Sequence, residues 1–434
     1  MNILLIKPFW PYPYSKGEDT YNRVWPPLSL LNCAGLLEKN GFKVKILDAH
    51  AERIKPEKID NYIERFDKIF ITSSSLDKWQ CPNIDISSFL ETVRCIKEAT
   101  DEVYVMGYHG TVEPERILNL TGAKAVIRGE PESAVLEICK DKALLKISGI
   151  SFKNNGEFIS TPQRELLDLK NLPVPAFHLL NFKKYYYEIL GDNFTLFEIS
   201  RGCKFSCRFC NKIMYGEKLR SKSKEQICKE VTQAVEKCNV KTGYFIDLDF
   251  LSNGEIAEAL CEYLIRKKYK FKWACQTRPD LLDVEVLKKM KAAGCTLIHM
   301  GIETGLQKLL DYLNKNMTIE KVHQAVKFCR EAGIKTLAFF IFGLPDETDA
   351  DRKEILKSVK ELNPDFISFH KMVPYKGSTL YRDKFEYKCN AEVNKFIYRG
   401  LLKFYLRPSY LCTLNLSAIL GGFRLFWGRI GTLR

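Results

Sequence analysis

Three cysteines lie within eight residues of this chain, in the segment Cys203-Lys-Phe-Ser-Cys207-Arg-Phe-Cys210. The C-x3-C-x2-C spacing puts three thiols on one short loop, directly after the apolar, strand-like run 196–200. A cubane iron–sulfur cluster has four irons, so three cysteine ligands leave one iron without a bond to protein. The segment therefore predicts an iron–sulfur cluster with one iron open to a small molecule.

Two other uses of grouped cysteines fit the segment less well. A structural zinc site takes four Cys or His ligands at close spacing, and the next residues of these types are Cys228 and His299. A disulfide framework needs an oxidising compartment, which nothing in the sequence indicates. The other cysteines are scattered through apolar patterns, as expected of buried, reduced thiols in a cytoplasmic protein.

The cysteine segment, following what we expect to be a first barrel strand, resembles the signature of the radical SAM enzymes. The resemblance implies a [4Fe-4S] cluster held by Cys203, Cys207 and Cys210, with S-adenosylmethionine (SAM) chelating the open iron. In that family, reductive cleavage of SAM yields a 5′-deoxyadenosyl radical that abstracts a hydrogen atom from the substrate. Phe209 matches the aromatic residue that packs near the adenine.

Residues 1–140 alternate expected strands and helices with short connections. Strands are expected at 2–6, 43–47, 68–72, 103–106 and 123–127, and helices at 28–40, 56–66, 86–98, 113–120 and 132–140. Apolar strands buried on both faces and separated by amphipathic helices predict a doubly wound, Rossmann-like parallel sheet. Such a sheet binds ligands beyond the carboxyl ends of its strands.

Small and polar residues follow the third, fourth and fifth of these strands, in the segments 73–76, 107–110 and 128–132. Together with the cysteine loop, this half of the chain resembles the cobalamin-binding domain of B12-dependent radical SAM enzymes. The resemblance implies corrin contacts by Ser74, Leu76, Gly107, His109, Gly129 and Glu130.

The chain departs from one pattern of cobalamin-binding domains. Methionine-synthase-type domains ligate cobalt through the histidine of D-x-H-x-x-G after the first strand, and here no histidine follows that strand. His50, in Asp48-Ala-His50, follows the second strand and lacks the glycine. Two expectations stay open: His50 as the lower axial ligand, or a lower face without any protein ligand.

The second half of the chain predicts a barrel. Residues 141–195 favour a linker that contains a hairpin with an Asn155-Gly156 turn. Strands then follow at 197–200, 243–248, 272–277, 296–302, 336–342 and 366–371, and helices at 224–237, 255–267, 284–293, 319–331 and 349–361. Six such units favour a partial (β/α)6 barrel over a closed eight-stranded one. The expected domains are 1–140, the linker 141–195, the barrel 196–388 and a helical tail 389–434.

Polar residues follow several barrel strands, at the carboxyl ends where barrels of this kind place their active sites. They include Asp247 and Asp249 after the second strand, Arg278 after the third and Glu303 in the fourth. The resemblance implies that the backbone of 247–249 holds the methionyl amino group, and that Arg278 and Glu303 face SAM or substrate. A plain ion pair between Arg278 and Glu303 is the alternative.

The tail 389–434 predicts a basic amphipathic helix. Its cations Lys395, Arg399, Lys403 and Arg407 recur every four residues, and no acidic residue follows Glu392. Two interpretations stay open: a peripheral contact of 395–430 with the inner face of a membrane, or a helix packed on the barrel with a solvated basic face. No apolar run reaches the roughly 18 residues of a membrane-spanning helix.

Taken together, these features predict a cytoplasmic, cobalamin-dependent radical SAM enzyme. The expected reaction is C-methylation of an unactivated carbon in a small-molecule or lipid-like substrate, with an external electron donor of the flavodoxin or ferredoxin type. Oxidative cyclisation or rearrangement, methylthiolation with a second cluster, and a sensor without catalytic activity remain as alternatives. The net charge of +14 permits an anionic partner, but no nucleic-acid-binding module is recognisable, so no nucleic-acid partner is expected.

Overall fold

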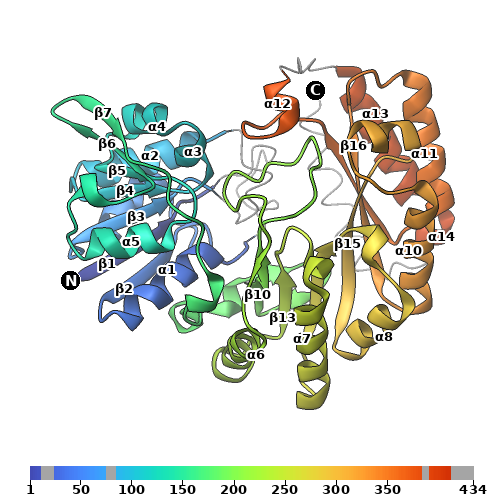
Figure 1. The fold of residues 1–434 in the computed structure, drawn as a ribbon, viewed down its shortest axis with the longest axis horizontal. Helices are drawn as coiled ribbons and strands as arrows, with labels where there is room; N and C mark the ends of the chain where they lie inside the picture. Colours follow the sequence, from blue (N-terminus) through green and yellow to red (C-terminus); the bar gives the residue numbers. More distant parts are fainter. Residues whose placement is uncertain (11–23, 75–84, 384–390, 412–434) are drawn as a thin grey trace. The chain divides into compact units, whose positions relative to one another are not determined.

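The computed structural model describes residues 1–10, 24–74, 85–383 and 391–411 (Figure 1). Within these ranges the chain forms two compact units. The first contains 1–10, 24–204 and 210–272, and the second contains 205–209 and everything described from 273 onward. Cys203 and Cys210 belong to the first unit and Cys207 to the second.

The N-terminal sheet confirms the predicted doubly wound arrangement. Its strands lie in the order β2-β1-β3-β4-β5-β6-β7, and β1 to β5 pair in parallel. The strands are β1 Asn2–Lys7, β2 Lys43–Asp48, β3 Lys68–Thr72, β4 Val103–Met106, β5 Ala125–Ile127, β6 Ile150–Asn154 and β7 Glu157–Ser160. The hairpin expected in the linker is present, and β6 pairs with β5 antiparallel, so the hairpin extends this sheet and covers its edge.

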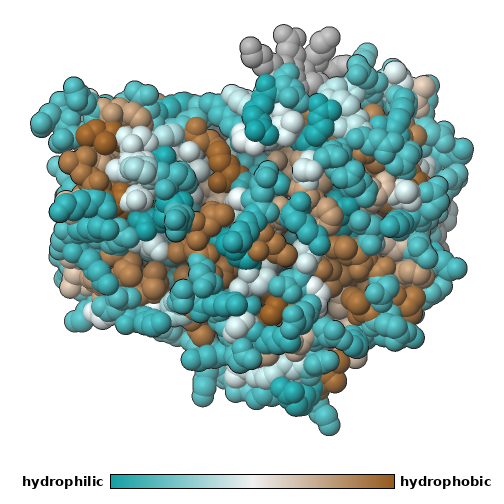
Figure 2. Space-filling view, viewed as in Figure 1, coloured by the Kyte–Doolittle hydropathy of each residue, from teal (hydrophilic) through white to brown (hydrophobic). Residues whose placement is uncertain are grey.

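Helices cover both faces of this sheet (Figure 1). They are α1 Leu28–Lys39, α2 Ser87–Lys97, α3 Tyr108–Val112, α4 Pro114–Thr121 and α5 Glu132–Cys139. Helix α1 packs beside α5, whereas α2 and α4 pack together over a core that includes Ile69, Val105 and Ile117. The helix expected at 56–66 is the shorter 3-10 helix η1, Pro56–Tyr62. Figure 2 shows mainly hydrophilic side chains on the viewed face, with smaller hydrophobic groups between them.

The second large sheet confirms the predicted partial barrel. Its order is β10-β13-β14-β15-β16-β17, with strands at β10 Phe194–Phe197, β13 Thr242–Phe245, β14 Lys272–Thr277, β15 Cys295–Glu303, β16 Lys335–Phe342 and β17 Phe366–Lys371. The first strand was expected at 197–200, which is wrong by three residues. Ile199 is fully buried although it lies beyond the strand, so the apolar run continues past the sheet. The second strand ends at Phe245, before the expected limit of 248.

The barrel helices follow the expected order. They are α6 Lys224–Thr232, which continues as the π-helix η6 Gln233–Lys237, then α7 Gly254–Lys267, α8 Val284–Ala292, α9 Gln307–Tyr312, α10 Ile319–Glu331 and α11 Asp349–Leu362. Capping boxes start α6 at Ser223 and α11 at Thr348, and each satisfies two orphan donors of the first turn. Helix α9 was not predicted.

Short elements connect these parts. They are η2 Leu144–Lys146, η3 Leu169–Asn171, η4 Phe177–Leu179, η5 Phe182–Lys184, η7 Phe250–Asn253, η8 Pro279–Leu281, β8 Tyr186–Tyr187, β9 Gly191–Asp192, β11 Ser200–Arg201, β12 Arg220–Ser221 and α12 Thr379–Arg382. Strands β11 and β12 matter most here, because they pair antiparallel at the two ends of the cysteine loop.

The tail forms α13 Ala391–Tyr405 and α14 Pro408–Leu411. Helix α13 packs on β17, where the Tyr405 hydroxyl donates to Ile367 O at 2.7 Å. Lys395, Arg399 and Lys403 are exposed, whereas Arg407 donates to Pro364 O at 3.0 Å. The packed helix with a solvated basic face is therefore present, with three of the four cations on that face. No helix in the described ranges is both long enough and apolar enough to cross a membrane.

Candidate active site

The cysteine loop is closed at its base by β11 and β12. Arg201 pairs with Arg220 across this ladder, so residues 201–220 leave and return at the same point. Gly202 has φ +85°, and a Cβ at this position would lie 2.2 Å from Lys218 O. Only glycine fits there, because both the left-handed backbone and the close carbonyl exclude a side chain.

The three cysteines are reduced thiols, with Cys203 buried and Cys207 and Cys210 half-buried. Among the described residues, no set of three or more His, Cys, Asp or Glu side chains is arranged to hold a single metal ion. A single ion needs ligands that converge on one point. Cysteines of a cubane cluster each bind a different iron, so their sulfurs are spread apart. The donor set therefore fits a cluster by its chemistry and spacing, and its assignment as ligands stays a prediction.

Arg278 lies against the part of the loop that carries Cys207. Its Nη1 donates to Cys207 Sγ at 3.9 Å, and its guanidinium lies 3.8 Å from the centre of the Phe205 ring. Nε and Nη2 donate to Asp280 at 2.9 and 3.0 Å, and Nη2 also donates to Lys315 O at 2.6 Å. These contacts hold a permanent cation in a defined orientation beside a thiol.

Glu303 ends β15, with φ +70° and a register shift against β16 between Gly301 and Glu303. Its Oε1 accepts from Lys315 Nζ at 2.7 Å, and both side chains are buried. Burial lowers the pKa of Lys315 and the Glu303 carboxylate raises it, with the net shift upward. The alternative, an Arg278–Glu303 ion pair, is wrong, because Arg278 pairs with Asp280 and Glu303 pairs with Lys315. That Arg278 and Glu303 face SAM or substrate stays a prediction.

Lys315 was missed by the sequence reasoning. It follows the unpredicted helix α9, and its Nζ lies 5.6 Å from the centre of the Phe209 ring. Lys315 follows Glu303 by 12 residues, and the chain must turn back between them to bring the two side chains together. The only local signal was a lysine between two asparagines, Asn314 and Asn316, both with positive φ.

Asp247 lies just beyond β13, and its buried carboxylate holds the chain that leaves β10. It accepts from Ile199 N at 3.2 Å, from Ser200 N at 2.6 Å and from Ser200 Oγ at 2.6 Å. Burial raises the pKa of Asp247 to about 7, although the hydrogen-bond donors act in the opposite direction. Asp249 Oδ2 accepts from Ser252 Oγ at 2.6 Å. Both carboxylates thus shape the loops at the strand tips, and a backbone contact with SAM stays a prediction.

At the carboxyl edge of the N-terminal sheet, the ends of β3 and β4 are lined by hydroxyl groups and glycine. A Cβ at Gly107, which has φ +102°, would lie 3.0 to 3.2 Å from the hydroxyls of Thr72, Ser73 and Ser74. Ser73 Oγ is buried and has no hydrogen-bond partner among the residues that the structure describes. His109 Nδ1 lies 2.8 Å from Ser73 O. Small side chains and an unsatisfied hydroxyl fit a large planar ligand such as a corrin.

The other residues named for the corrin site stay predictions, and the structure shows the surroundings of those that it describes. Leu76 lies outside the described residues. Gly129 has φ +78°, and its N–H donates to Thr111 Oγ1 at 2.9 Å. His50 is buried, and its Nδ1 accepts from Trp10 N at 3.3 Å, so this nitrogen is used within the protein. Whether His50 also ligates cobalt stays a prediction.

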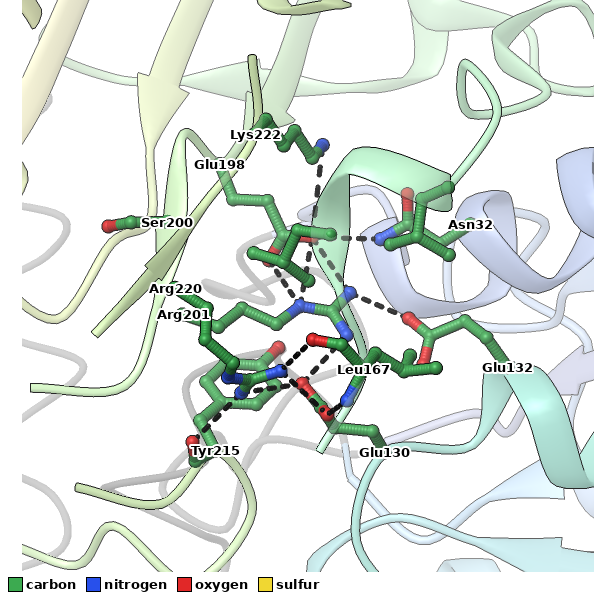
Figure 3. A network of polar contacts seen from close by, with 12 residues as sticks. Asn32, Glu130, Glu132, Leu167, Glu198, Ser200, Arg201, Tyr215, Arg220 and Lys222 are labelled. Atoms are coloured by element: carbon green, nitrogen blue, oxygen red, sulfur yellow. Dashed lines mark hydrogen bonds and ion pairs between the residues drawn. The ribbon is translucent and has the colours of Figure 1, made fainter. Parts of the chain in front are cut away.

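Glu130 lies in a buried network of charges (Figure 3). It accepts from Arg220 at 3.0 Å through both carboxylate oxygens, from Arg201 at 3.2 Å and from Leu167 N at 2.8 Å. Arg201 donates further to Glu132 at 2.6 Å and to Glu198 at 2.7 Å. The carboxylate expected on the corrin is thus bound to the base of the cysteine loop.

Further groups surround this core of the network (Figure 3). Asn32 donates to Glu198 at 3.1 Å, and Lys222 donates to Glu230 at 2.8 Å. Burial raises the pKa of Glu230 to about 7. Burial also raises the pKa of Glu198, but Arg201 and Lys222 lower it more, so this carboxyl stays charged.

Comparison with known protein families identifies both halves of the chain. Residues 19–139 match the B12 binding domain, and residues 197–359 match the radical SAM superfamily. The chain is a B12-binding member of the radical SAM superfamily. This confirms the predicted family and its cofactors, a [4Fe-4S] cluster, SAM and cobalamin.

Similar proteins support the same assignment. The uncharacterised methyltransferase PH0819 of Pyrococcus horikoshii is 27% identical, and the alignment covers 95% of this chain and 94% of that protein. The anaerobic magnesium-protoporphyrin IX monomethyl ester cyclase of Cereibacter sphaeroides is 25% identical over 88% of this chain and 63% of its own length. The hopanoid C-3 methylase of Methylococcus capsulatus is 29% identical over 58% of this chain and 48% of its own.

The fold is shared with a solved structure of this class. The radical S-adenosylmethionine methyltransferase TsrM from Kitasatospora setae superposes with a TM-score of 0.68, over 85% of this chain and 72% of that one. Its sequence identity of 18% makes this a likeness of fold. The two chains therefore share a fold over the aligned parts.

Proposed function

We propose that this protein is a cobalamin-dependent C-methyltransferase that acts on an unactivated carbon. One observation carries the proposal: a B12-binding domain and a radical SAM domain follow each other on a chain that aligns over 95% of its length with a protein named as a methyltransferase. When bound, the cluster with SAM supplies hydrogen abstraction and cobalamin supplies the methyl group.

The protein's own residues bind, orient and shield. Cys203, Cys207 and Cys210 hold the cluster, and Arg278 places a cation and a hydrogen bond on the Cys207 sulfur at 3.9 Å. Asp247 fixes the backbone of Ser200, at the entrance to the loop. Such prior orientation of reacting groups lowers the barrier without new chemistry.

The corrin site follows from the same reasoning. The hydroxyls of Ser73 and Ser74 and the bare backbone of Gly107 line the carboxyl edge of β3 and β4. This is the edge at which doubly wound sheets bind ligands. We place Gly129 and His109 at the same edge, and Glu130 behind it as part of the framework.

We further propose a lipid-like substrate reached at a membrane surface. One relative is named for a hopanoid, and α13 exposes Lys395, Arg399 and Lys403 on one face. Each cation near an anionic lipid surface contributes about 1 kcal/mol. Co-sedimentation with vesicles of phosphatidylglycerol and phosphatidylcholine should fall strongly in the K395A/R399A/K403A variant. Equal binding of both proteins would contradict the membrane contact and leave the enzymatic proposal untouched.

The central experiment uses anaerobically reconstituted protein with hydroxocobalamin, a low-potential reductant and SAM that carries a CD3 methyl group. About four irons per chain are expected, whereas about eight would indicate the second cluster of a methylthiotransferase. Of three further cysteines that could ligate such a cluster, Cys33 and Cys95 lie within α1 and α2, and Cys81 is outside the described residues.

Product analysis separates the remaining alternatives. We expect 5′-deoxyadenosine, and a CD3-labelled product when a total lipid extract is added. Cyclised or rearranged product without the label would favour the cyclase alternative. No 5′-deoxyadenosine from protein that carries both cofactors would favour a sensor.

A further inference from the structure

Both ends of the cysteine loop bind the same carboxylate. Arg201 begins the loop and Arg220 ends it, and the two residues pair across the β11–β12 ladder. Arg201 Nη1 donates to Glu130 Oε1 at 3.2 Å, and the two terminal nitrogens of Arg220 donate to Oε2 and Oε1 at 3.0 Å each (Figure 3). One acidic side chain of the N-terminal domain therefore joins the start and the end of the loop.

This contact is buried and highly connected. The side chains of Glu130 and Arg201 are 3% and 1% exposed. Arg220 also donates to Leu167 O at 2.6 Å and to Tyr215 O at 2.9 Å, and the Arg201 guanidinium lies 5.0 Å from the centre of the Tyr215 ring. The same arginines thus also contact Leu167 of the linker and Tyr215 inside the loop.

Burial decides what such a junction can do. Moving charges out of water costs about as much as their attraction returns, so a buried ion pair adds little net stability compared with apolar packing. A paired arrangement is nevertheless strongly preferred over any shifted one, because a shift leaves a buried charge unpaired. A junction of this kind therefore selects one geometry.

The position of Glu130 shows which geometry is selected. Glu130 follows Gly129, directly after the carboxyl end of β5, on the edge where the N-terminal sheet would bind its ligand. Cys203 lies two residues after Arg201. The carboxylate thus lies close along the chain to the proposed corrin edge, and its ion pair with Arg201 links it to the segment that carries Cys203.

We propose that Glu130 is a positioning residue that holds the base of the cysteine loop against the ligand-binding edge of the N-terminal sheet, and so sets the separation of the cluster and the corrin. This inference rests on the proposed function, because it requires both cofactors on one chain. It assigns Glu130 to the framework and not to the corrin surface.

The test compares Glu130→Gln with the matched control Glu137→Gln. Glu137 lies on α5 of the same domain and also binds an arginine of the linker, Arg164 at 2.9 Å, but it contacts neither end of the loop. Glu130→Asp keeps the charge and shortens the side chain, and it serves if the glutamine variant does not fold.

Two measurements report on position independently of turnover. Hydrogen exchange of the full chain without cofactors should become at least tenfold faster across 201–220 in the Glu130 variant and stay unchanged in the Glu137 variant. Pulsed dipolar EPR between the reduced cluster and cob(II)alamin should give one narrow distance in the wild type and a broad distribution in the Glu130 variant. In steady-state assays, the variant should form more 5′-deoxyadenosine per methylated product.

The outcomes separate this inference from the proposed function. A narrow, unchanged cluster–cobalt distance in Glu130→Gln, with unchanged exchange of 201–220, would overturn the positioning role. Weaker cobalamin binding with an unchanged distance would return Glu130 to the corrin surface and also overturn it. A wild-type protein that binds no cobalamin or builds no cluster would instead refute the proposed function, and the exchange experiment would still test the loop junction.

Discussion

The carboxyl edge of the N-terminal sheet and the strand tips of the barrel differ in the kind of polar side chain that they bury. At the ends of β3 and β4 the first is neutral and small: among the described residues the buried Ser73 hydroxyl has no hydrogen-bond partner, and Gly107 leaves space. At the ends of β1 and β2 it carries a buried ion pair, Lys7–Asp48 at 3.4 Å. The second is charged, with Arg278 bound to Asp280 and Glu303 bound to Lys315. The difference teaches that one edge is shaped for a broad ligand held by backbone and hydroxyls, and the other for charge held in a set orientation.

The physical reason lies in the cost of burying charge. A buried ion without a partner is very unfavourable, so charged side chains at the barrel tips must come in pairs. Burying a neutral hydroxyl without a partner costs far less free energy than burying an unpaired charge. Hydroxyls can therefore line a binding edge before the ligand is bound. If the two edges act separately, a change at one edge should leave the cofactor of the other edge bound.

The largest effect is expected on the barrel side, from replacing any cysteine of the loop. Cys203→Ala, Cys207→Ala and Cys210→Ala should each lose the cluster and all SAM cleavage, since two remaining thiolates leave two of the four irons without a protein ligand. Cobalamin binding should persist. Iron content and 5′-deoxyadenosine formation provide the measurement, with Cys238→Ala, half-buried and outside the loop, as the control. Intact cleavage in a loop variant would contradict the ligand assignment.

The converse change affects the N-terminal edge. Gly107→Ala places a methyl group 3.0 to 3.2 Å from three hydroxyls and forces a side chain onto φ +102°. We expect a cost on the order of 1–3 kcal/mol and cobalamin affinity at least about tenfold weaker, with normal cluster content. Gly122→Ala, also at positive φ but at the end of α4, is the matched control. Equal cobalamin binding by both variants would remove Gly107 from the corrin site.

A smaller effect should come from the cation beside Cys207. Arg278→Gln removes a positive charge and the donor to Cys207 Sγ, both of which stabilise the more negative, reduced cluster. The reduction potential should fall by roughly 60 mV, which is tenfold in the one-electron equilibrium. EPR-monitored redox titration measures it. Arg208→Gln also removes a loop cation, but that guanidinium is bound to Asp383 at 2.7 Å, so its potential should change less.

The smallest and most specific effect concerns pH. Burial raises the pKa of Asp247 to about 7, above its value of about 4 in the unfolded chain. The folded protein thus binds more protons between these values, so the free energy of unfolding decreases as pH rises from 4 to 7, on the order of 1 kcal/mol per pH unit. Asp247→Asn should flatten this slope in denaturant titrations, and Asp249→Asn should leave it. A slope that persists in the first variant would show that other groups cause it.

Local patterns predicted the elements well where strand and burial coincide. The expected strands 68–72, 103–106, 272–277 and 366–371 and the helix 319–331 have the observed bounds. The first barrel strand was displaced because Ile199 is buried outside the sheet, and an apolar run does not reveal which of its residues are hydrogen-bonded to a neighbouring strand.

The sequence by itself determined the chemistry and the architecture: three thiols at a spacing that leaves an iron open, and two successive α/β patterns of different lengths. Both are local properties, set by neighbouring residues and by the periods of strand and helix. Only the tertiary structure decided the partners of the charged groups. Glu130 lies 71 residues from Arg201 and 90 from Arg220, and Arg278 reaches Lys315 across 37. Such pairs form because the fold buries these charges together. A local sequence pattern does not predict which residues distant in the chain will form an ion pair.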